Sequence, residues 1–164
     1  MMAWMLSLPN NKTKKSLLEW AHEQMKRGVP RQVICDYLLA KRPLSMSLEE
    51  LQAASEAESE LSGVMLERNL KGKSLESAGK LDQAIELYEA NVTDWFSGNH
   101  PYDRLRAIYI KRKQYAEAIR VCRAFVTVAD TLLEQGSNRS DLAPKREKFI
   151  QWIAKLEQEI HEES

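Results

Sequence analysis

The chain has 164 residues, of which 24 are basic and 24 are acidic, so its formal net charge at pH 7 is zero. A chain of this length buries about two-thirds of its unfolded surface, so it needs neither disulfides nor a metal ion to hold a core. The balanced charge disfavours nucleic acid as a partner. Cys35 and Cys122 are isolated and outside any CxxC pattern, which is typical of reduced thiols in a cytosolic protein.

The first fifteen residues, "MMAWMLSLPNNKTKK", place their positive charges after a short apolar patch. That order is wrong for a secretory signal. No later run approaches the ~20 apolar residues of a membrane helix. We therefore expect a soluble, cytoplasmic protein. Glycine and proline are few, and no hairpin signal of the Asn-Gly type occurs, so we expect an all-α fold.

Residues 14–27 place Leu17, Leu18, Ala21 and Met25 on one face at helical spacing. Gly28 would end that helix, and Pro30 suits the start of a second helix that closes before Pro43. The sequence thus predicts an N-terminal helical hairpin over residues 1–46.

A helix-turn-helix that contacts DNA through residues 14–42 is the alternative for this hairpin. Arg31 and Gln32 would open its recognition helix. Gln24 stands where that motif wants a small residue, and Asp36 would face phosphate. The simpler interpretation is a hairpin that packs on the rest of the chain.

A second domain is expected over residues 47–164, with the whole chain forming one compact unit. Ser47 and Glu50 have the spacing of a capping box at the start of its first helix. Two continuations are open: the helix runs on into residues 64–77, or it breaks near Ser62 and Gly63.

Residues 70–92 and 110–125 repeat at a constant offset, which brings Ala84 onto Ala118. We call this displacement the repeat offset. It also brings Leu75 onto Tyr109 and the segment "LDQAI" onto "YAEAI". A period of this length predicts two helical hairpins of the same kind.

These residues resemble the tetratricopeptide repeat over about residues 65–126. The matching positions are Gly72, Leu75, Gly79, Leu81, Ala84 and Tyr88 in the first unit, and Tyr102, Leu105, Tyr109, Tyr115 and Ala118 in the second. The resemblance implies an α–α superhelix whose first helices line a surface for a partner protein or peptide.

Six positions depart from the family's pattern. Arg68 and Lys71 stand where large apolar residues are usual, Arg106 and Lys113 stand where the other unit has Gly72 and Gly79, and Asn91 and Phe125 replace a small residue. The units are therefore divergent, and a related helical-repeat hairpin is the alternative.

Residues 115–135 are predicted to form a long second helix, followed by a break at "GSNRSDLAP". Pro144 would then open a terminal helix. Its apolar stripe comprises Phe149, Ile150, Trp152, Ile153, Leu156 and Ile160. We expect this helix to cover the open face of the last repeat, as terminal units of helical arrays do.

The segment "SGNHPYDRL" contains His100, Tyr102, Asp103 and Arg104, which are residue types of an acid–base site. Pro101, however, suits a first helical turn, with Asn99 or His100 as the N-cap and Asp103 at the positive end of the helix dipole. Nucleophile, phosphate-loop and metal-ligand motifs are missing. We therefore expect a helix start here and no catalysis, cofactor or metal.

The sequence predicts an adaptor that binds a partner protein or peptide. The candidate binding residues lie on the first helices of the two units: Asn69, Lys73, Glu76, Asp103, Ile110 and Lys111. Since two repeats leave an open flank, a homo-oligomer is a further expectation.

Overall fold

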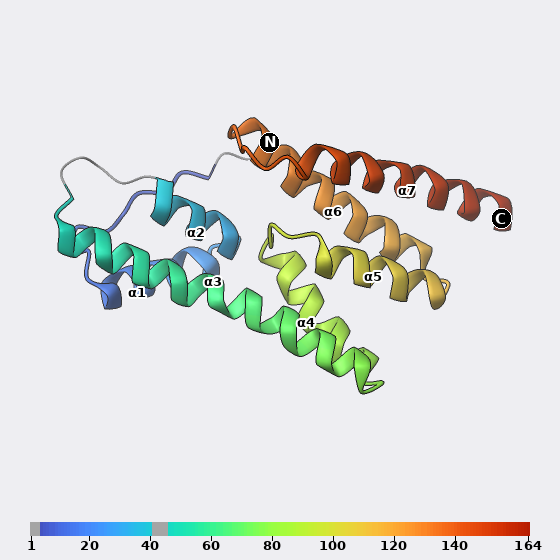
Figure 1. Ribbon diagram of the computed structural model, residues 1–164, viewed down its shortest axis with the longest axis horizontal. Helices are drawn as coiled ribbons and strands as arrows, with labels where there is room; N and C mark the ends of the chain where they lie inside the picture. The colour runs from blue at the N-terminus through green and yellow to red at the C-terminus, as the bar shows by residue number, and fades with distance from the viewer. Residues whose placement is uncertain (1–3, 41–45) are drawn as a thin grey trace. The chain divides into compact units, whose positions relative to one another are not determined.

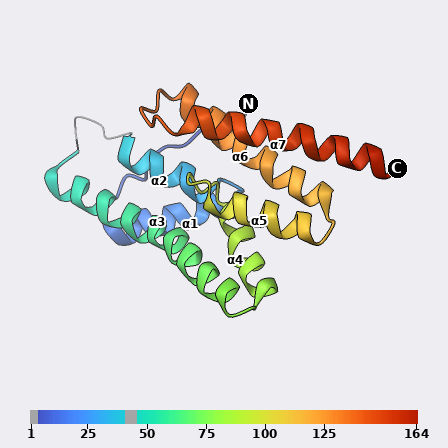
Figure 2. The same cartoon turned by 45° about the vertical axis from the view of Figure 1, so that its right-hand side comes forward.

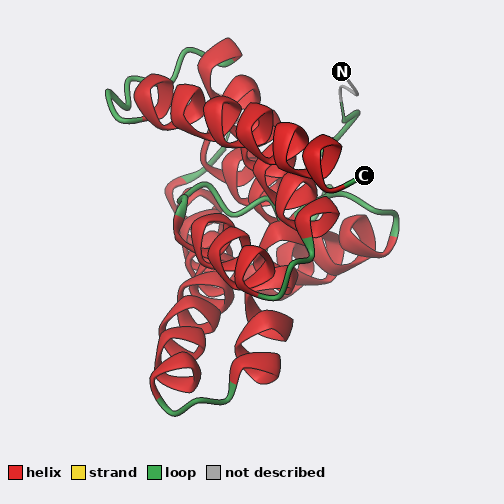
Figure 3. Cartoon of the chain, turned by 90° about the vertical axis from the view of Figure 1, so that its right-hand side faces the viewer, coloured by secondary structure: helices red, strands yellow, loops and turns green. Residues whose placement is uncertain are grey.

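The computed structural model describes residues 4–40 and 46–164, and the regular structure in those residues is all helical (Figures 1 and 3). The all-α prediction is confirmed. The helices are α1 (Lys14–Lys26), α2 (Arg31–Ala40), α3 (Leu48–Ser77), α4 (Leu81–Thr93), α5 (His100–Lys111), α6 (Tyr115–Glu134) and α7 (Leu142–Glu163). None of these helices is long and apolar enough to cross a membrane.

The chain divides into two compact units, Met1–Glu67 and Arg68–Ser164, and the division falls inside α3. The question left open by the sequence is thereby answered, because α3 runs unbroken past Gly63. The capping box at its start is confirmed: the Ser47 amide donates to Glu50 Oε1 and the Glu50 amide donates to Ser47 Oγ, both at 3.1 Å. The expected division into a hairpin over residues 1–46 and a second domain over residues 47–164 stays a prediction.

In the N-terminal unit, α1 and α2 form the expected hairpin. Gly28 ends α1 with φ of +92°, a backbone conformation that glycine adopts without strain. The first part of α3 presents buried residues at helical spacing to the same core. That core comprises Leu17, Ala21, Ile34, Cys35, Leu38, Ala54, Ala57, Leu61 and Met65.

In the C-terminal unit, the helices pack in chain order, and Figure 2 shows α5, α6 and α7 side by side. A chain of aromatic rings runs through this core. The ring centroids of Tyr102 and Phe125 lie 5.3 Å apart, those of Phe125 and Phe149 lie 4.3 Å apart, and those of Phe149 and Trp152 lie 4.9 Å apart. These ring contacts link α5 to α6 and α6 to α7, so α7 packs on the last repeat as the sequence predicts.

Helix α7 begins at Leu142, two residues before the predicted start at Pro144. Proline is tolerated in the first turn because the amides there have no intrahelical acceptor. Ile160, expected in the apolar stripe, is 38% exposed and lies beyond the buried part of the helix.

We call the last turns of α3, from Arg68 onward, together with α4 the first repeat hairpin, and α5 with α6 the second. Their boundaries match at the repeat offset: α3 ends at Ser77 and α5 at Lys111, while α4 begins at Leu81 and α6 at Tyr115. The repeat period read from the sequence therefore coincides with equal helix boundaries at the turn of each hairpin, whereas α4 ends at Thr93 and α6 runs on to Glu134, beyond the equivalent Thr127.

The turns of the two repeat hairpins also share their backbone geometry. Gly79 has φ of +74° and Lys113, at the equivalent position, has φ of +57°. The next residue in each turn, Lys80 or Gln114, donates its amide to a carbonyl of the preceding helix at 2.8 Å. This is the Schellman termination of a helix. Lys113 thus adopts the left-handed conformation without the freedom of a glycine.

The helix crossing inside each repeat hairpin is packed differently. In the first, Gly72 lies against the ring of Tyr88, and a Cβ placed on Gly72 would come within 2.5 Å of Tyr88 Cε1. At the equivalent positions, the second has Arg106 and Cys122. The first hairpin therefore has its small residue on the first helix and its large residue on the second, and the second hairpin has the opposite arrangement.

Arg68, one of the six positions that depart from the repeat pattern, takes part in a polar contact with α4. Its Nη1 donates to Asp94 Oδ2 at 2.5 Å and to Asn91 Oδ1 at 3.3 Å. Asn91 is fully buried. A charged and hydrogen-bonded network thus joins α3 to α4 at this point.

Candidate partner-binding face

The structure places the six predicted binding residues in the C-terminal unit, three on the last turns of α3 and three on α5. Lys73 and Lys111 are exposed. Asn69, Glu76, Asp103 and Ile110 are half-buried. The two exposed lysines are therefore the members of the set most accessible to a partner.

An ion pair joins α3 to α5 at the centre of this region. Arg104 donates from Nη2 to Glu76 Oε2 at 2.7 Å and from Nε to Glu76 Oε1 at 3.0 Å. Tyr88 of α4 donates its hydroxyl to Glu76 Oε1 at 2.8 Å. The hydrogen bonds from Arg104 lower the pKa of Glu76 most, and Tyr88 lowers it further. Glu76 therefore remains a carboxylate that holds three helices together.

His100 is the first residue of α5, as the helix-start interpretation requires. Asn99 is the N-cap, but its side chain makes no capping hydrogen bond. The His100 ring meets Tyr88 edge-on, with centroids 5.5 Å apart and planes at 80°. His100 Nε2 is buried and has no hydrogen-bond partner in the described structure.

The pKa of His100 is lowered. Burial is the largest cause of the lower pKa. It penalises the charged imidazolium, and the positive charge of Lys73 lowers the pKa further. The sequence motif around His100 offered no carboxylate at a suitable spacing, yet the fold brings Glu76 of α3 into its electrostatic surroundings.

Asn69 and Ile110 serve internal contacts. Asn69 Oδ1 accepts a hydrogen bond from Asn91 Nδ2 at 3.2 Å, so its amide oxygen is engaged by α4. Ile110 packs against the hydrophobic core of the C-terminal unit. Both side chains are half-buried, and their role in binding a partner stays a prediction.

Asp103 pairs with Arg106 on its own helix, at 2.7 Å between Asp103 Oδ1 and Arg106 Nη2. The Arg106 guanidinium lies over the Trp152 ring, 3.5 Å from its centroid. Asp103 thus supports a cation–π contact between α5 and α7.

Arg104 is not among the six predicted binding residues, although it pairs with Glu76 between α5 and α3. At the repeat offset it corresponds to Leu70, so the repeat pattern carries no sign of an arginine with a function. Its partner Glu76 lies 28 residues earlier in the chain, beyond any helical spacing.

In the helix-turn-helix alternative at residues 14–42, Arg31 and Gln32 would contact DNA bases, but in the structure both make internal hydrogen bonds. Arg31 Nη1 donates to the Leu61 carbonyl at 3.5 Å, and Gln32 Nε2 donates to Asp36 Oδ1 at 3.0 Å. Burial raises the pKa of Asp36. Lys41, which the alternative also uses, lies outside the described residues. Binding of DNA stays a prediction that no feature of this hairpin favours.

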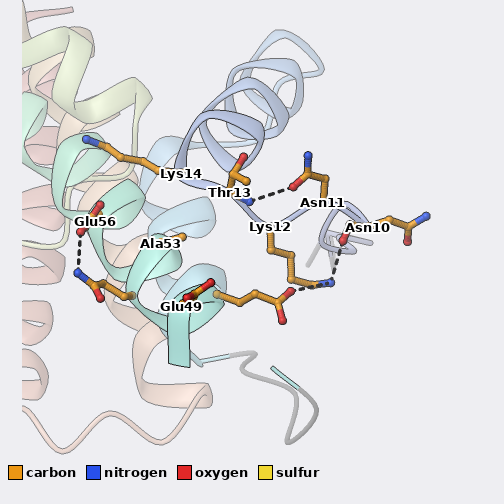
Figure 4. A pocket seen from close by; sticks show the side chains of 10 residues that line it. Asn10, Asn11, Lys12, Thr13, Lys14, Glu49, Ala53 and Glu56 are labelled. Carbon is orange, nitrogen blue, oxygen red and sulfur yellow. Dashed lines mark hydrogen bonds and ion pairs between the residues drawn. The ribbon is translucent and has the colours of Figure 1, made fainter. Parts of the chain in front are cut away.

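A shallow polar pocket lies in the N-terminal unit between residues 10–14 and the first turns of α3 (Figure 4). Its lining mixes signs: Lys12 Nζ lies 3.8 Å from Glu50 Oε2, and Glu49 and Glu56 also face the pocket. No ligand class is favoured by this mixture. The described residues contain no group of three or more histidine, cysteine or acidic side chains that could hold a metal ion.

The comparisons with known proteins match no protein family, no curated protein and no solved structure.

Proposed function

We propose that the chain is a protein–protein interaction module that holds a partner segment on the α3–α5 face, a surface made of Lys73, Glu76, His100, Arg104 and Lys111. The Glu76–Arg104 ion pair is the observation that carries the proposal, because it fixes the first helices of the two repeat hairpins to each other. A surface held in this way is preorganised, which lowers the entropic cost of binding.

The proposal includes a tetratricopeptide-like role for the two repeat hairpins. It is supported by the equal helix boundaries at the repeat offset and by the equivalent turns at Gly79 and Lys113. In such arrays the first helices of successive hairpins form the binding surface, and those helices are α3 and α5 here. The module acts by binding and has no catalysis of its own.

The charge of the α3–α5 face favours an acidic partner segment. Lys73 and Lys111 are exposed, and no ion pair engages either of them within the described residues. Arg104 adds a third cation that is 41% exposed, opposed by Glu76. Complementary charge of this kind mainly accelerates association and makes it sensitive to salt.

The test is affinity capture with three forms of the chain: wild type, Lys73→Glu/Lys111→Glu, and the control Lys80→Glu/Lys155→Glu. The control makes the same charge change at exposed lysines on the α3–α4 turn and on α7. We expect a protein that is captured by the wild type and the control but lost with the first variant. With that protein purified, we expect the dissociation constant to rise about tenfold in the first variant.

Equal capture by all three forms would contradict the proposed face. Capture of a second copy of the chain would mean that the protein forms a homo-oligomer. Light scattering over a series of concentrations would then measure the mass of that oligomer.

A further inference from the structure

His100 is half-buried in the first turn of α5, beside Tyr88 of α4. Its Nε2 atom is buried without a hydrogen-bond partner, and its ring rests edge-on against Tyr88. Neutral imidazole tolerates this position because it carries no charge. Imidazolium carries a proton on both ring nitrogens, so it would bury a donor without an acceptor.

The charged groups around His100 come from two helices. Lys73 of α3 and Arg104 of α5 oppose a positive charge on the ring, whereas Glu76 of α3 and Asp103 of α5 favour one. The two carboxylates are already engaged. Glu76 accepts from Tyr88 and Arg104, and Asp103 pairs with Arg106. A protonated His100 could donate a hydrogen bond to Glu76 only if Glu76 gave up one of the contacts that join α3, α4 and α5.

We propose that His100 is a proton-sensitive latch: the neutral ring holds the first turn of α5 against α3 and α4, and the protonated ring loosens that turn. The inference does not depend on the proposed function, because its measurements need no partner.

The sign follows from linkage. A histidine whose pKa is lower in the folded chain than in the unfolded chain contributes stability above its unfolded pKa, and this contribution is lost as the pH falls. The window therefore opens below about pH 6.5, the ordinary value for histidine. One proton changes the unfolding equilibrium constant by up to about tenfold per pH unit.

The first experiment is a pH titration between 7.5 and 5.5, followed by NMR of the histidine rings and by chemical unfolding. We expect His100 to titrate below the ordinary value for histidine, because burial opposes its charge. Amide exchange in the first turn of α5 should accelerate on acidification. Replacing His100 by glutamine should flatten the loss of stability with falling pH, whereas His161→Gln should leave that loss unchanged. A His100 midpoint at or above the ordinary value for histidine would overturn the inference.

The second experiment keeps the histidine and changes its surroundings. Lys73→Gln removes a nearby positive charge from an exposed position, so we expect the His100 midpoint to rise. Lys71→Gln is the matched control, because Lys71 is also exposed on α3 but does not act on His100. An unchanged midpoint in Lys73→Gln, or an equal rise in both variants, would contradict the arrangement.

Discussion

The first repeat hairpin crosses its helices with Gly72 on α3 and Tyr88 on α4, whereas the second uses Arg106 on α5 and Cys122 on α6. Tyr88 fills the first crossing and reaches across to Glu76 with its hydroxyl. Arg106 instead leaves the crossing and stacks on Trp152 of α7. The two crossings are therefore packed differently: a tyrosine ring fills the first, whereas the second pairs a cysteine with an arginine whose guanidinium contacts α7.

The largest test of this difference is truncation of the residue on the second helix. Tyr88→Ala should cost about 3–5 kcal/mol of unfolding free energy, because it empties a fully buried site. Cys122→Ala removes only a sulfur atom and should cost about 1 kcal/mol. Chemical unfolding of both variants measures the two values. Equal losses would mean that the two crossings are packed alike.

The next test inserts a methyl group on the first helix. Gly72→Ala should cost about 1–3 kcal/mol, because the new Cβ displaces a buried Tyr88 ring that is held by Glu76. Gly63→Ala, on the same helix, meets nothing within 4 Å and should stabilise the chain by about 0.5–1 kcal/mol. If both variants gained stability, Gly72 would be serving no packing role.

The smallest test concerns the turns. Lys113→Gly should stabilise the second repeat hairpin by up to about 1 kcal/mol, because glycine adopts a positive φ without the clash of a side chain. Gly79→Ala should destabilise the first by about 1 kcal/mol for the same reason. Thermal unfolding would detect both shifts. Shifts of the same sign would show that the two turns are not equivalent.

Much of the fold could be predicted because its signals are local. The offset that aligns Ala84 with Ala118 anticipates the matching helix boundaries, and the capping box at Ser47 places the start of α3. Both depend on residues that are close in sequence or that recur at a fixed period.

The contacts of the candidate binding residues could be predicted only in part, because several of them join residues that are far apart in sequence. Spacing places Asn69 and Asp103 on helix surfaces and allows Asp103 to pair with Arg106 three residues on, but it cannot show that Asn91 engages Asn69 or that Arg106 stacks on Trp152. The pairing of Arg104 with Glu76 was missed for the same reason. Long polar side chains find partners on neighbouring helices, and those partners leave no periodic pattern.

Cys35 and Cys122 are buried thiols, one in the N-terminal unit and one in the C-terminal unit. Burial raises the pKa of Cys122 to about 12, so its sulfur is not an attacking thiolate in the closed protein at neutral pH. A thiol reagent would therefore react with each cysteine only after the surrounding unit opens. The two labelling rates would report the opening of each unit separately, and equal rates would mean that the helix common to both makes them open together.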